Sequence, residues 1–273
     1  MSDNINNLPP LRDVIDQNGL RAKKSLGQNF LLDLNLTRKI ARAARLPEKA
    51  EVIEVGPGPG GLSRAILMEY PDARLSAIEM DSRAIGALSP LVDAADGRLT
   101  LIEGDAMAYD AYQGHIVANL PYNIATPLLV GWLRQIHAGD ALHSITIMVQ
   151  KEVAQRITAA TGAKHYGRLA VLTQCLCHAR IALTLPPSAF TPPPKVDSAV
   201  VHLRPKKTQD LPPFEAIEAI TAQAFQQRRK MLRASLKPYL PAMGDLGIDP
   251  QARPETHSVE QFIALAKSRN PKQ

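Results

Sequence analysis

The sequence predicts an α/β fold in which a mostly parallel sheet of seven strands is followed by a small, all-helical C-terminal domain. Two observations predict the sheet: short runs rich in Val and Ile recur through the first two thirds of the chain, and segments of helical pattern separate them. A third observation predicts the second domain, because a polar, proline-containing linker precedes a tail in which only helical pattern is found.

The apolar runs predict the first five strands, and the segments between them predict helices. We expect strands at 51–55, 75–79, 99–102, 115–119 and 144–149, and helices at 62–70, 82–92, 124–136 and 152–160. Helices of this length are suited to crossover connections, so these strands are expected to run parallel to one another. Two later runs, 179–185 and 198–203, are expected to complete the sheet as an antiparallel hairpin.

The tail after the linker at 205–213 predicts helices only. Their expected ranges are 214–227, 229–240 and 259–267. The domain boundary is therefore predicted near Lys206, which divides the chain into residues 1–205 and residues 206–273.

Composition excludes several classes of protein. The chain has 273 residues, of which 45% are hydrophobic and 21% charged, so it is neither disordered nor collagen-like. Cys175 and Cys177, the only cysteines, form neither a useful disulfide nor a metal site, which favours a reducing compartment and no metal. The longest stretch without a formal charge contains Pro121 and Pro127, which excludes a membrane-spanning helix. The N-terminus lacks a secretory signal, so a cytoplasmic location is expected.

The distribution of charge says more than the net value of +6. Segment 19–45 has seven basic residues and one acidic residue, whereas segment 48–110 has twelve acidic and five basic residues. Segment 204–237 is basic again, with eight basic residues and three acidic ones. Two basic segments on either side of an acidic one favour a polyanion held at one face of the protein.

A glycine-rich turn follows the first predicted strand and precedes a helix. Gly56, Gly58 and Gly61 fit the pattern G-x-G-x-x-G, and Glu79 ends the next strand, where a ribose-binding acid is expected. This pattern alone does not separate NAD from another adenosine cofactor. An acid inside the strand end, Glu54, and another after the third strand, Asp105, favour S-adenosylmethionine, because that cofactor is cationic and has no pyrophosphate.

The tetrapeptide Asn119-Leu120-Pro121-Tyr122 follows the fourth strand, at the edge where open α/β sheets place reacting groups. An adenine amine is a poor nucleophile because its lone pair is delocalised into the ring. The Asn119 side chain and the Leu120 carbonyl are suited to accept hydrogen bonds from that amine, while Tyr122 stacks on a flipped base. The methylated amine is acidic enough to lose its proton to water, so a side-chain base is not required.

Two further loops carry candidate residues. Phe190 lies in a proline-rich loop where it is suited to form the second face of a base sandwich, with Lys195 near backbone phosphate. In the segment that starts with Lys23 and Lys24, the lysines suit phosphate. Asn29 and the Leu31 backbone are placed to close over the cofactor.

Taken together, these motifs closely resemble the ribosomal RNA adenine dimethyltransferase family, and within it the bacterial small-subunit enzymes. The motifs, in family order, are KKSLGQNFL (23–31), EVGPGPGGL (54–62), IEMD (78–81), EGDAM (103–107), NLPYNIATPLL (119–129), VQKEVAQRI (149–157), FTPPPKVDSAVV (190–201) and AFQQRRKMLR (224–233). The resemblance implies a Rossmann-like class I methyltransferase that dimethylates N6 of two adjacent adenosines near the 3′ end of 16S rRNA. It also implies a role in biogenesis of the small ribosomal subunit.

The resemblance also implies roles for individual residues. The cofactor would contact Asn29, Leu31, Gly56, Glu79, Asp105 and Asn119, and the target base would contact Asn119, Leu120, Tyr122 and Phe190. Basic residues expected to bind RNA are Lys23, Lys24, Lys195, Arg228, Arg229, Lys230 and Arg233. The expected partner is 16S rRNA within the small subunit, and the expected state is a monomer.

Three alternatives stay open. A resistance methylase acting on 23S rRNA has the same motifs, but Leu120 in place of Ile and the basic tail favour the small-subunit branch. An NAD-dependent dehydrogenase has similar glycines, but it leaves the motif at Asn119–Tyr122 unexplained. A non-catalytic ribosome-assembly factor needs only the basic surface, whereas Glu79, Asp105 and Asn119 indicate catalysis.

Overall fold

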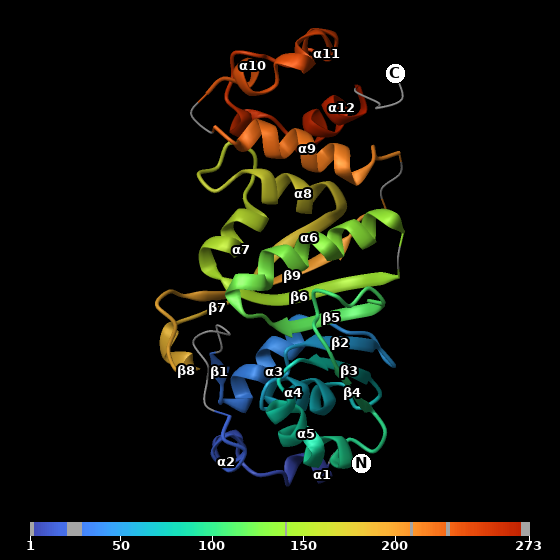
Figure 1. Cartoon of the computed structure of the whole chain (residues 1–273), viewed down its shortest axis with the longest axis vertical. Helices are drawn as coiled ribbons and strands as arrows, with labels where there is room; N and C mark the ends of the chain where they lie inside the picture. The colour runs from blue at the N-terminus through green and yellow to red at the C-terminus, as the bar shows by residue number, and fades with distance from the viewer. Residues whose placement is uncertain (1–2, 21–28, 140, 208–209, 228–229, 269–273) are drawn as a thin grey trace.

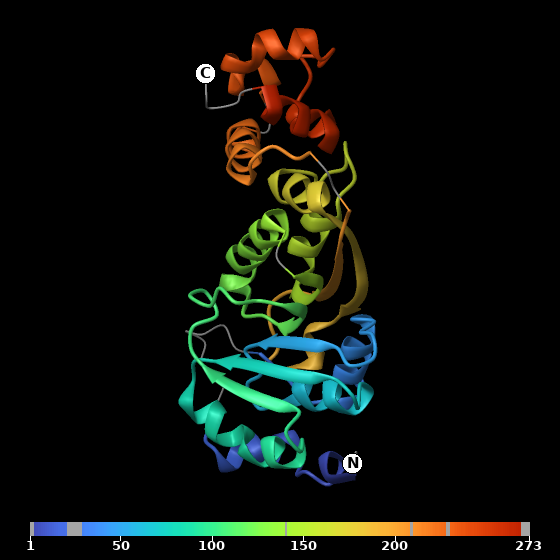
Figure 2. The same cartoon turned by 90° about the vertical axis from the view of Figure 1, so that its right-hand side faces the viewer.

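The computed structural model describes residues 3–20, 29–139, 141–207, 210–227 and 230–268. The sheet and its flanking helices form one part of an elongated molecule, and α10 (Leu232–Ser235) and α11 (Leu240–Asp245) lie at the far end of the other part. Helices α1 (Asp3–Asn6) and α2 (Leu11–Gln17) lie at the opposite end of the molecule (Figures 1 and 2). None of the helices described is long and apolar enough to cross a membrane.

The seven-stranded sheet confirms the predicted α/β fold. Its order is β4 (Leu99–Glu103), β3 (Arg74–Glu79), β2 (Glu51–Val55), β5 (Gly114–Asn119), β6 (Leu142–Gln150), β9 (Ser198–Pro205) and β7 (Cys177–Leu185). The first five strands in this order are parallel, and β9 runs antiparallel to both β6 and β7, as the predicted hairpin requires. The carboxyl ends of β2 to β5 therefore meet at one edge.

Helices cover both faces of the sheet and bury two apolar cores. One core contains residues of α3 (Leu34–Ala43), α4 (Gly61–Glu69) and α5 (Ser82–Ala94), packed on Val117 and Met148 of the sheet. The other contains residues of α6 (Tyr122–Ala138), α7 (Lys151–Thr158) and α8 (Arg168–Leu176), packed on Ile116 and Ile147. Because successive side chains of a strand point to opposite faces, both faces of the central strands are buried.

Side-chain caps fix where two of these helices begin. The Asp33 carboxylate accepts hydrogen bonds from the backbone N–H groups of Asn35 and Leu36, at 2.8 and 3.3 Å, and so begins α3. Asp81 accepts from the N–H of Arg83 at 3.2 Å and begins α5 directly after β3. These caps satisfy N–H groups that have no partner within the helix, and they hold the loops that precede the helices.

The C-terminal part differs from its prediction in one element. Instead of one helix over 229–240, the structure has α10, a 3₁₀ turn η3 (Lys237–Tyr239) and α11, so that prediction is wrong. Pro238 accounts for the break after α10, because a proline lacks the N–H group that a helix interior needs, whereas Pro241 lies in the first turn of α11, where a helix tolerates proline. The neighbouring helices, α9 (Phe214–Phe225) and α12 (Val259–Ser268), lie where helices were expected.

The C-terminal helices share a core with the sheet part. Helices α9 and α12 pack against α8, and one buried apolar cluster extends from Trp132 on α6 to Phe262 on α12. All regular elements described after residue 207 are helical. The boundary near Lys206 stays a prediction, since burial is continuous across it.

The structure adds elements that the sequence analysis did not predict. Helices α1 and α2 precede the N-terminal motif, and α8 lies between α7 and β7. A second, two-stranded sheet joins β1 (Phe30–Leu31) to β8 (Phe190–Thr191), so two motifs that are distant in the sequence lie side by side.

Candidate active site

A pocket lies at the carboxyl ends of β2, β3 and β5. Its lining includes backbone and side chains from the glycine-rich turn, from the ends of these strands and from the segment before α3. Among the residues predicted for the site, those that line it are Asn29, Leu31, Gly56, Glu79, Asp105, Asn119, Leu120 and Tyr122. The fold thus brings the predicted cofactor-binding and base-binding residues to one cavity.

The glycine-rich turn opens the pocket at Gly56. This residue has a φ angle of +68°, which glycine adopts without strain, and a Cβ atom there would meet no protein atom within 4 Å. A ligand therefore has room to approach the backbone. Gly60 has a different role, because its φ is +84° and a Cβ would lie 2.7 Å from Leu88 Cδ2, so it allows α5 to pack closely.

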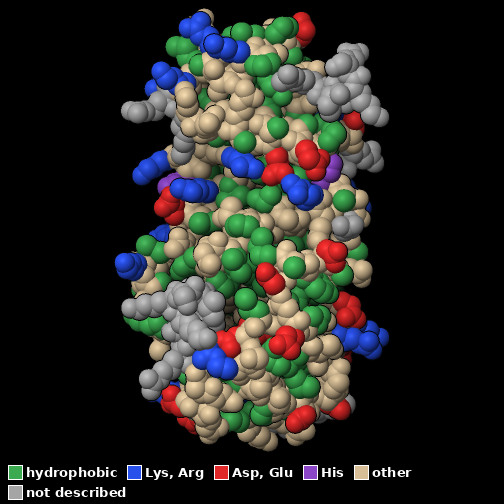
Figure 3. All heavy atoms as spheres, viewed as in Figure 1, with side chains coloured by type: hydrophobic (Ala, Val, Ile, Leu, Met, Phe, Trp, Pro, Cys, Tyr) green, Lys and Arg blue, Asp and Glu red, His purple; other side chains and the backbone are tan. Residues whose placement is uncertain are grey.

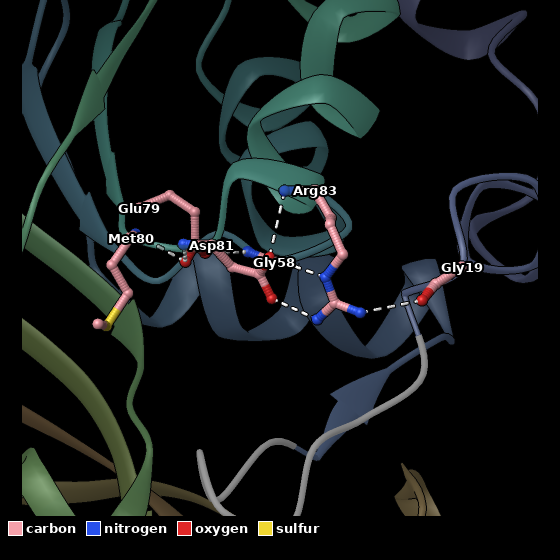
Figure 4. A network of polar contacts seen from close by, with 6 residues as sticks. All are labelled: Gly19, Gly58, Glu79, Met80, Asp81 and Arg83. Atoms are coloured by element: carbon pink, nitrogen blue, oxygen red, sulfur yellow. Dashed lines mark hydrogen bonds and ion pairs between the residues drawn. The ribbon is translucent and has the colours of Figure 1, made fainter.

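Backbone N–H groups of two loops orient the Glu79 side chain (Figure 4). Its Oε1 accepts hydrogen bonds from Met80 and Asp81, both at 2.9 Å, and its Oε2 accepts one from Gly58 at 3.2 Å. Glu79 is 7% exposed and ends β3. The carboxylate thus joins the glycine-rich turn to the loop after β3.

A second network holds that loop from the other side. The Arg83 guanidinium donates to both oxygens of Asp81, at 3.0 and 2.5 Å, and to the Gly19 carbonyl at 3.2 Å (Figure 4). The loop that supplies two of the hydrogen bonds to Glu79 is therefore fixed to the segment after α2.

Glu54 is a buried carboxyl at the base of the pocket. It is 1% exposed, and the Ser63 hydroxyl on α4 donates a hydrogen bond to its Oε2 at 2.5 Å. Burial raises the pKa of Glu54 from 4.5 to about 8; the Ser63 hydrogen bond opposes this shift, and the nearby Glu79 charge adds to it. Near neutral pH Glu54 is therefore protonated.

The raised pKa of Glu54 predicts how stability depends on pH. Between about pH 4.5 and 8 the folded protein keeps a proton that the unfolded chain releases, so the free energy of unfolding falls as pH rises through this window. Glu54→Gln is expected to flatten that slope by up to about 1.4 kcal/mol per pH unit. Urea unfolding of both proteins from pH 5 to 8.5 measures it, and equal slopes would contradict the buried, protonated state.

Asp105 and Asn119 lie at the carboxyl ends of two strands, β4 and β5, which β3 and β2 separate in the sheet. Asp105 follows β4 and is exposed, and its Oδ1 accepts a hydrogen bond from the Met107 N–H at 2.8 Å. Asn119 is the last residue of β5 and is half-buried. Both line the pocket, as Gly104 does.

Tyr122 stands at the start of α6, beside the pocket. Its hydroxyl shares a hydrogen bond of 2.7 Å with Ser198 Oγ at the start of β9. Burial raises the pKa of Tyr122 above its usual value, so the phenol is neutral. Leu120, two residues earlier, is 2% exposed, which holds the turn of Asn119–Tyr122 in the core while Tyr122 stays half-buried.

The structure places Phe190 next to Leu31 but not in the pocket lining. The two residues pair between β8 and β1, and Phe190 is 4% exposed within the core on the α3 side. Phe30, which the sequence analysis did not single out, lines the pocket instead, close to Gly58. Its position between Asn29 and Leu31 was the available signal.

The predicted RNA-binding residues either do not line the pocket or lie outside the described residues. Lys195, Lys230 and Arg233 are exposed. Residues 23, 24, 228 and 229 lie outside the part of the chain that the structure describes. Figure 3 shows Lys and Arg side chains spread mainly over the helical half of this face, while Asp and Glu prevail over the sheet half.

The chemistry of the lining decides between cofactor classes. The described residues that line the pocket include three acidic side chains, Glu54, Glu79 and Asp105, of which the buried Glu54 is protonated, and they include no Lys, Arg or His. Such a lining suits a cofactor with cationic sulfonium and amino groups, whereas the pyrophosphate of NAD would be repelled. No cluster of metal-ligating side chains occurs among the described residues. The residues therefore fit S-adenosylmethionine and argue against the dehydrogenase.

Comparison with known proteins decides the family. The model of the family described as "Ribosomal RNA adenine dimethylase" matches residues 19–270. The chain belongs to this family. It is therefore a ribosomal RNA methyltransferase with the class I methyltransferase fold, and the family implies use of S-adenosylmethionine.

The relatives extend over nearly the whole chain. "Ribosomal RNA small subunit methyltransferase A" of Dinoroseobacter shibae is 53% identical, covering 96% of this chain and 97% of the relative. The protein of the same name from Rhizobium etli is 52% identical, with coverage of 97% and 98%.

Two solved structures share the fold. A dimethyladenosine transferase from Plasmodium falciparum matches with a TM-score of 0.73 and 25% identity, covering 85% of this chain and 94% of the other. The 23S rRNA methyltransferase ErmE matches with a TM-score of 0.69 and 25% identity, covering 88% of this chain and 98% of the other. The fold is thus shared with a dimethyladenosine transferase and with a 23S rRNA methyltransferase, while the relatives named for the small subunit are about twice as similar to this chain in sequence.

Proposed function

We propose that this protein dimethylates N6 of two adjacent adenosines near the 3′ end of 16S rRNA in the small ribosomal subunit, with S-adenosylmethionine as methyl donor. The observation that carries the proposal is that acidic residues and the residues Asn119–Tyr122 line the same pocket. The names of the relatives support the choice of the small subunit. We also propose that the protein acts as a monomer in the cytoplasm, where ribosomal subunits are assembled.

The residues of the cofactor pocket are assigned by their chemistry. When bound, S-adenosylmethionine supplies an electrophilic methyl group. Glu79, held by three backbone N–H groups, accepts hydrogen bonds from the ribose hydroxyls, and Asp105 accepts from the adenine amine. Asn29, Leu31 and Gly56 enclose the remainder of the cofactor.

The target adenine is oriented by the turn at the end of β5. The Asn119 side-chain oxygen and the Leu120 carbonyl accept hydrogen bonds from N6–H, which localises the nitrogen lone pair and directs it toward the donor. Tyr122 stacks on the base, and its bond to Ser198 fixes the plane of the ring. After transfer the methylated nitrogen loses its proton to water. Phe190 would stack on the other face only after leaving its buried position.

The tail contributes affinity for RNA through Lys230 and Arg233, which are both exposed. Lys230→Gln/Arg233→Gln is expected to weaken binding to small subunits and to lower the slope of log K against log salt concentration by about 1.5, since each lost phosphate contact removes roughly 0.7–0.9. Filter binding at four salt concentrations measures it. An unchanged slope would mean that both side chains are only solvated.

The proposal is tested by incubating the protein with labelled S-adenosylmethionine and undermethylated ribosomal subunits. Label is expected in small subunits and not in large ones. Label in large subunits alone would favour the 23S rRNA alternative. Binding to small subunits without any incorporation would favour a non-catalytic assembly factor.

A further inference from the structure

A band of polar residues crosses one face of the sheet, within a layer that is otherwise apolar. His115 Nδ1 on β5 lies 2.8 Å from Ser144 Oγ on β6, and Thr146 Oγ1 on β6 lies 2.9 Å from His202 Nδ1 on β9. All four side chains are buried. Hydrogen bonds between neighbouring strands therefore satisfy these groups and fix their orientation.

The strand register extends this band to the edge strand β7. Thr146 is opposite His202, which in turn is opposite Arg180 of β7. Two residues further along β9, Arg204 is opposite His178 of β7. Residues two apart on a strand share a face, so the side chains of Arg180 and Arg204 lie on the same face of the sheet as His202.

Arg45, from the segment after α3, lies close to His202 and Arg180. It follows α3, which packs against β7 and β9. Burial lowers the pKa of His202 to about 4, and the charges of Arg180, Arg45 and Arg204 act in the same direction. The three guanidinium groups thus converge around a neutral imidazole, and the ends of the two basic segments of the sequence meet here.

These three arginines have no carboxylate partner among the described residues, in contrast to others nearby. On α3, Arg38 and Arg42 both pair with Glu69, but Arg45, Arg180 and Arg204 take part in no ion pair of the described chain. Arg180 Nη2 is also buried with no hydrogen-bond partner there. A buried donor without an acceptor is destabilising, so an anion bound here would supply the missing acceptor.

The cluster lies at the opposite edge of the sheet from the candidate active site. His115 and Ser144 are near the amino ends of β5 and β6, whereas Asn119 ends β5 beside the pocket. Four residues of strand, or about 13 Å, separate His115 from Asn119 along β5. None of Arg45, Arg180 and Arg204 lines that pocket, so the arginine cluster is separate from the candidate active site.

We propose that Arg45, Arg180 and Arg204 form a second binding surface for ribosomal RNA, which holds the phosphate backbone of a segment other than the one that carries the target adenosines. The choice of RNA rests on the proposed function. Guanidinium groups suit this ligand because they bind phosphate oxygens through two parallel hydrogen bonds.

The test compares two triple variants of equal charge. Arg45→Gln/Arg180→Gln/Arg204→Gln removes the unpaired arginines. Arg42→Gln/Arg134→Gln/Arg156→Gln removes three exposed arginines that are each paired with a carboxylate. Affinities for undermethylated small subunits and for protein-free 16S rRNA are measured at four salt concentrations, together with the affinity for S-adenosylmethionine and thermal unfolding.

The first variant is expected to bind both RNA substrates roughly 10- to 100-fold more weakly at ~0.1 M salt, with a salt slope lower by about 2, and to keep wild-type cofactor affinity. The control variant is expected to stay within about 3-fold of wild type. If the triple variant unfolds, Arg45→Gln and Arg204→Gln, each exposed, are expected to lower the slope singly by about 0.7.

Two results would overturn the proposal. One is a wild-type slope of log affinity against log salt concentration in the first triple variant or, if that variant unfolds, in Arg45→Gln and Arg204→Gln. The other is weaker binding to intact subunits with unchanged binding to protein-free RNA, which would identify an acidic protein as the partner. Failure of the proposed function is a separate outcome. In that case the wild-type protein transfers no methyl groups to small subunits, and this result does not depend on the RNA affinity of the variants.

Discussion

Glu79→Ala is expected to raise the Kd for S-adenosylmethionine by about 100-fold or more, because it removes a charged acceptor for two ribose hydroxyls, each bond contributing roughly 1.5–3 kcal/mol. The rate of methyl transfer at saturating cofactor is expected to change much less. Isothermal titration gives the Kd, and single-turnover assays with small subunits give the rate.

A matched control for this variant exists on the next strand. Glu103 ends β4 in register with Glu79, is exposed, and does not line the pocket. Glu103→Ala is therefore expected to keep wild-type affinity. Glu79→Ala also leaves three backbone N–H groups without their acceptor, so its thermal unfolding is measured as well. Wild-type cofactor affinity in a folded Glu79→Ala protein would remove the residue from the cofactor site.

Tyr122→Ala is expected to slow methyl transfer by roughly 5- to 150-fold, since base stacking on an aromatic side chain contributes about 1–3 kcal/mol. Cofactor affinity is expected to stay within about 3-fold of wild type, because stacking concerns the base alone. Single-turnover kinetics and isothermal titration separate the two effects.

Tyr122→Phe separates the ring from the hydroxyl. Tyr122→Phe keeps the aromatic ring for stacking and loses only the hydrogen bond to Ser198. Ser198→Ala removes the same hydrogen bond and leaves Tyr122 unchanged. Both variants are expected to transfer methyl groups within about 5-fold of wild type, the cost of one neutral hydrogen bond. Equal loss of cofactor affinity in Tyr122→Ala and Glu79→Ala would contradict the division of roles between the two residues.

The fold was largely predictable because its strands are local, apolar and rich in β-branched residues. Residues 51–55 form β2 as expected, and the turn after them has the φ angles that its glycines allow. Helix α8 was not predicted, since Arg168–Leu176 has buried residues on most of its surface and therefore lacks an amphipathic period. Pro238 interrupts the helix expected over 229–240.

The site was predictable where it depends on strand ends, and less so where it depends on contacts between distant segments. Glu79, Asp105 and Asn119 were placed by the rule that parallel strands present their carboxyl ends at one edge. The partner of Tyr122, Ser198, and the pairing that buries Phe190 beside Leu31 join distant parts of the chain. No local pattern encodes such contacts.

The acidic and basic segments of the sequence lie at different places on the sheet. The acidic segment supplies the carboxylates of the pocket, and the ends of the two basic segments, Arg45 and Arg204, meet on the far edge of the sheet. This arrangement keeps the site for a cationic cofactor apart from a surface suited to RNA phosphate.

The most direct test of the account is the identity of the modified nucleosides. Small subunits that lack the modification are incubated with the protein and S-adenosylmethionine, and the 16S rRNA is then digested and analysed by mass spectrometry. The account predicts N6,N6-dimethyladenosine at two adjacent positions near the 3′ end. Methyl groups on any other atom or nucleotide, or none at all, would contradict it.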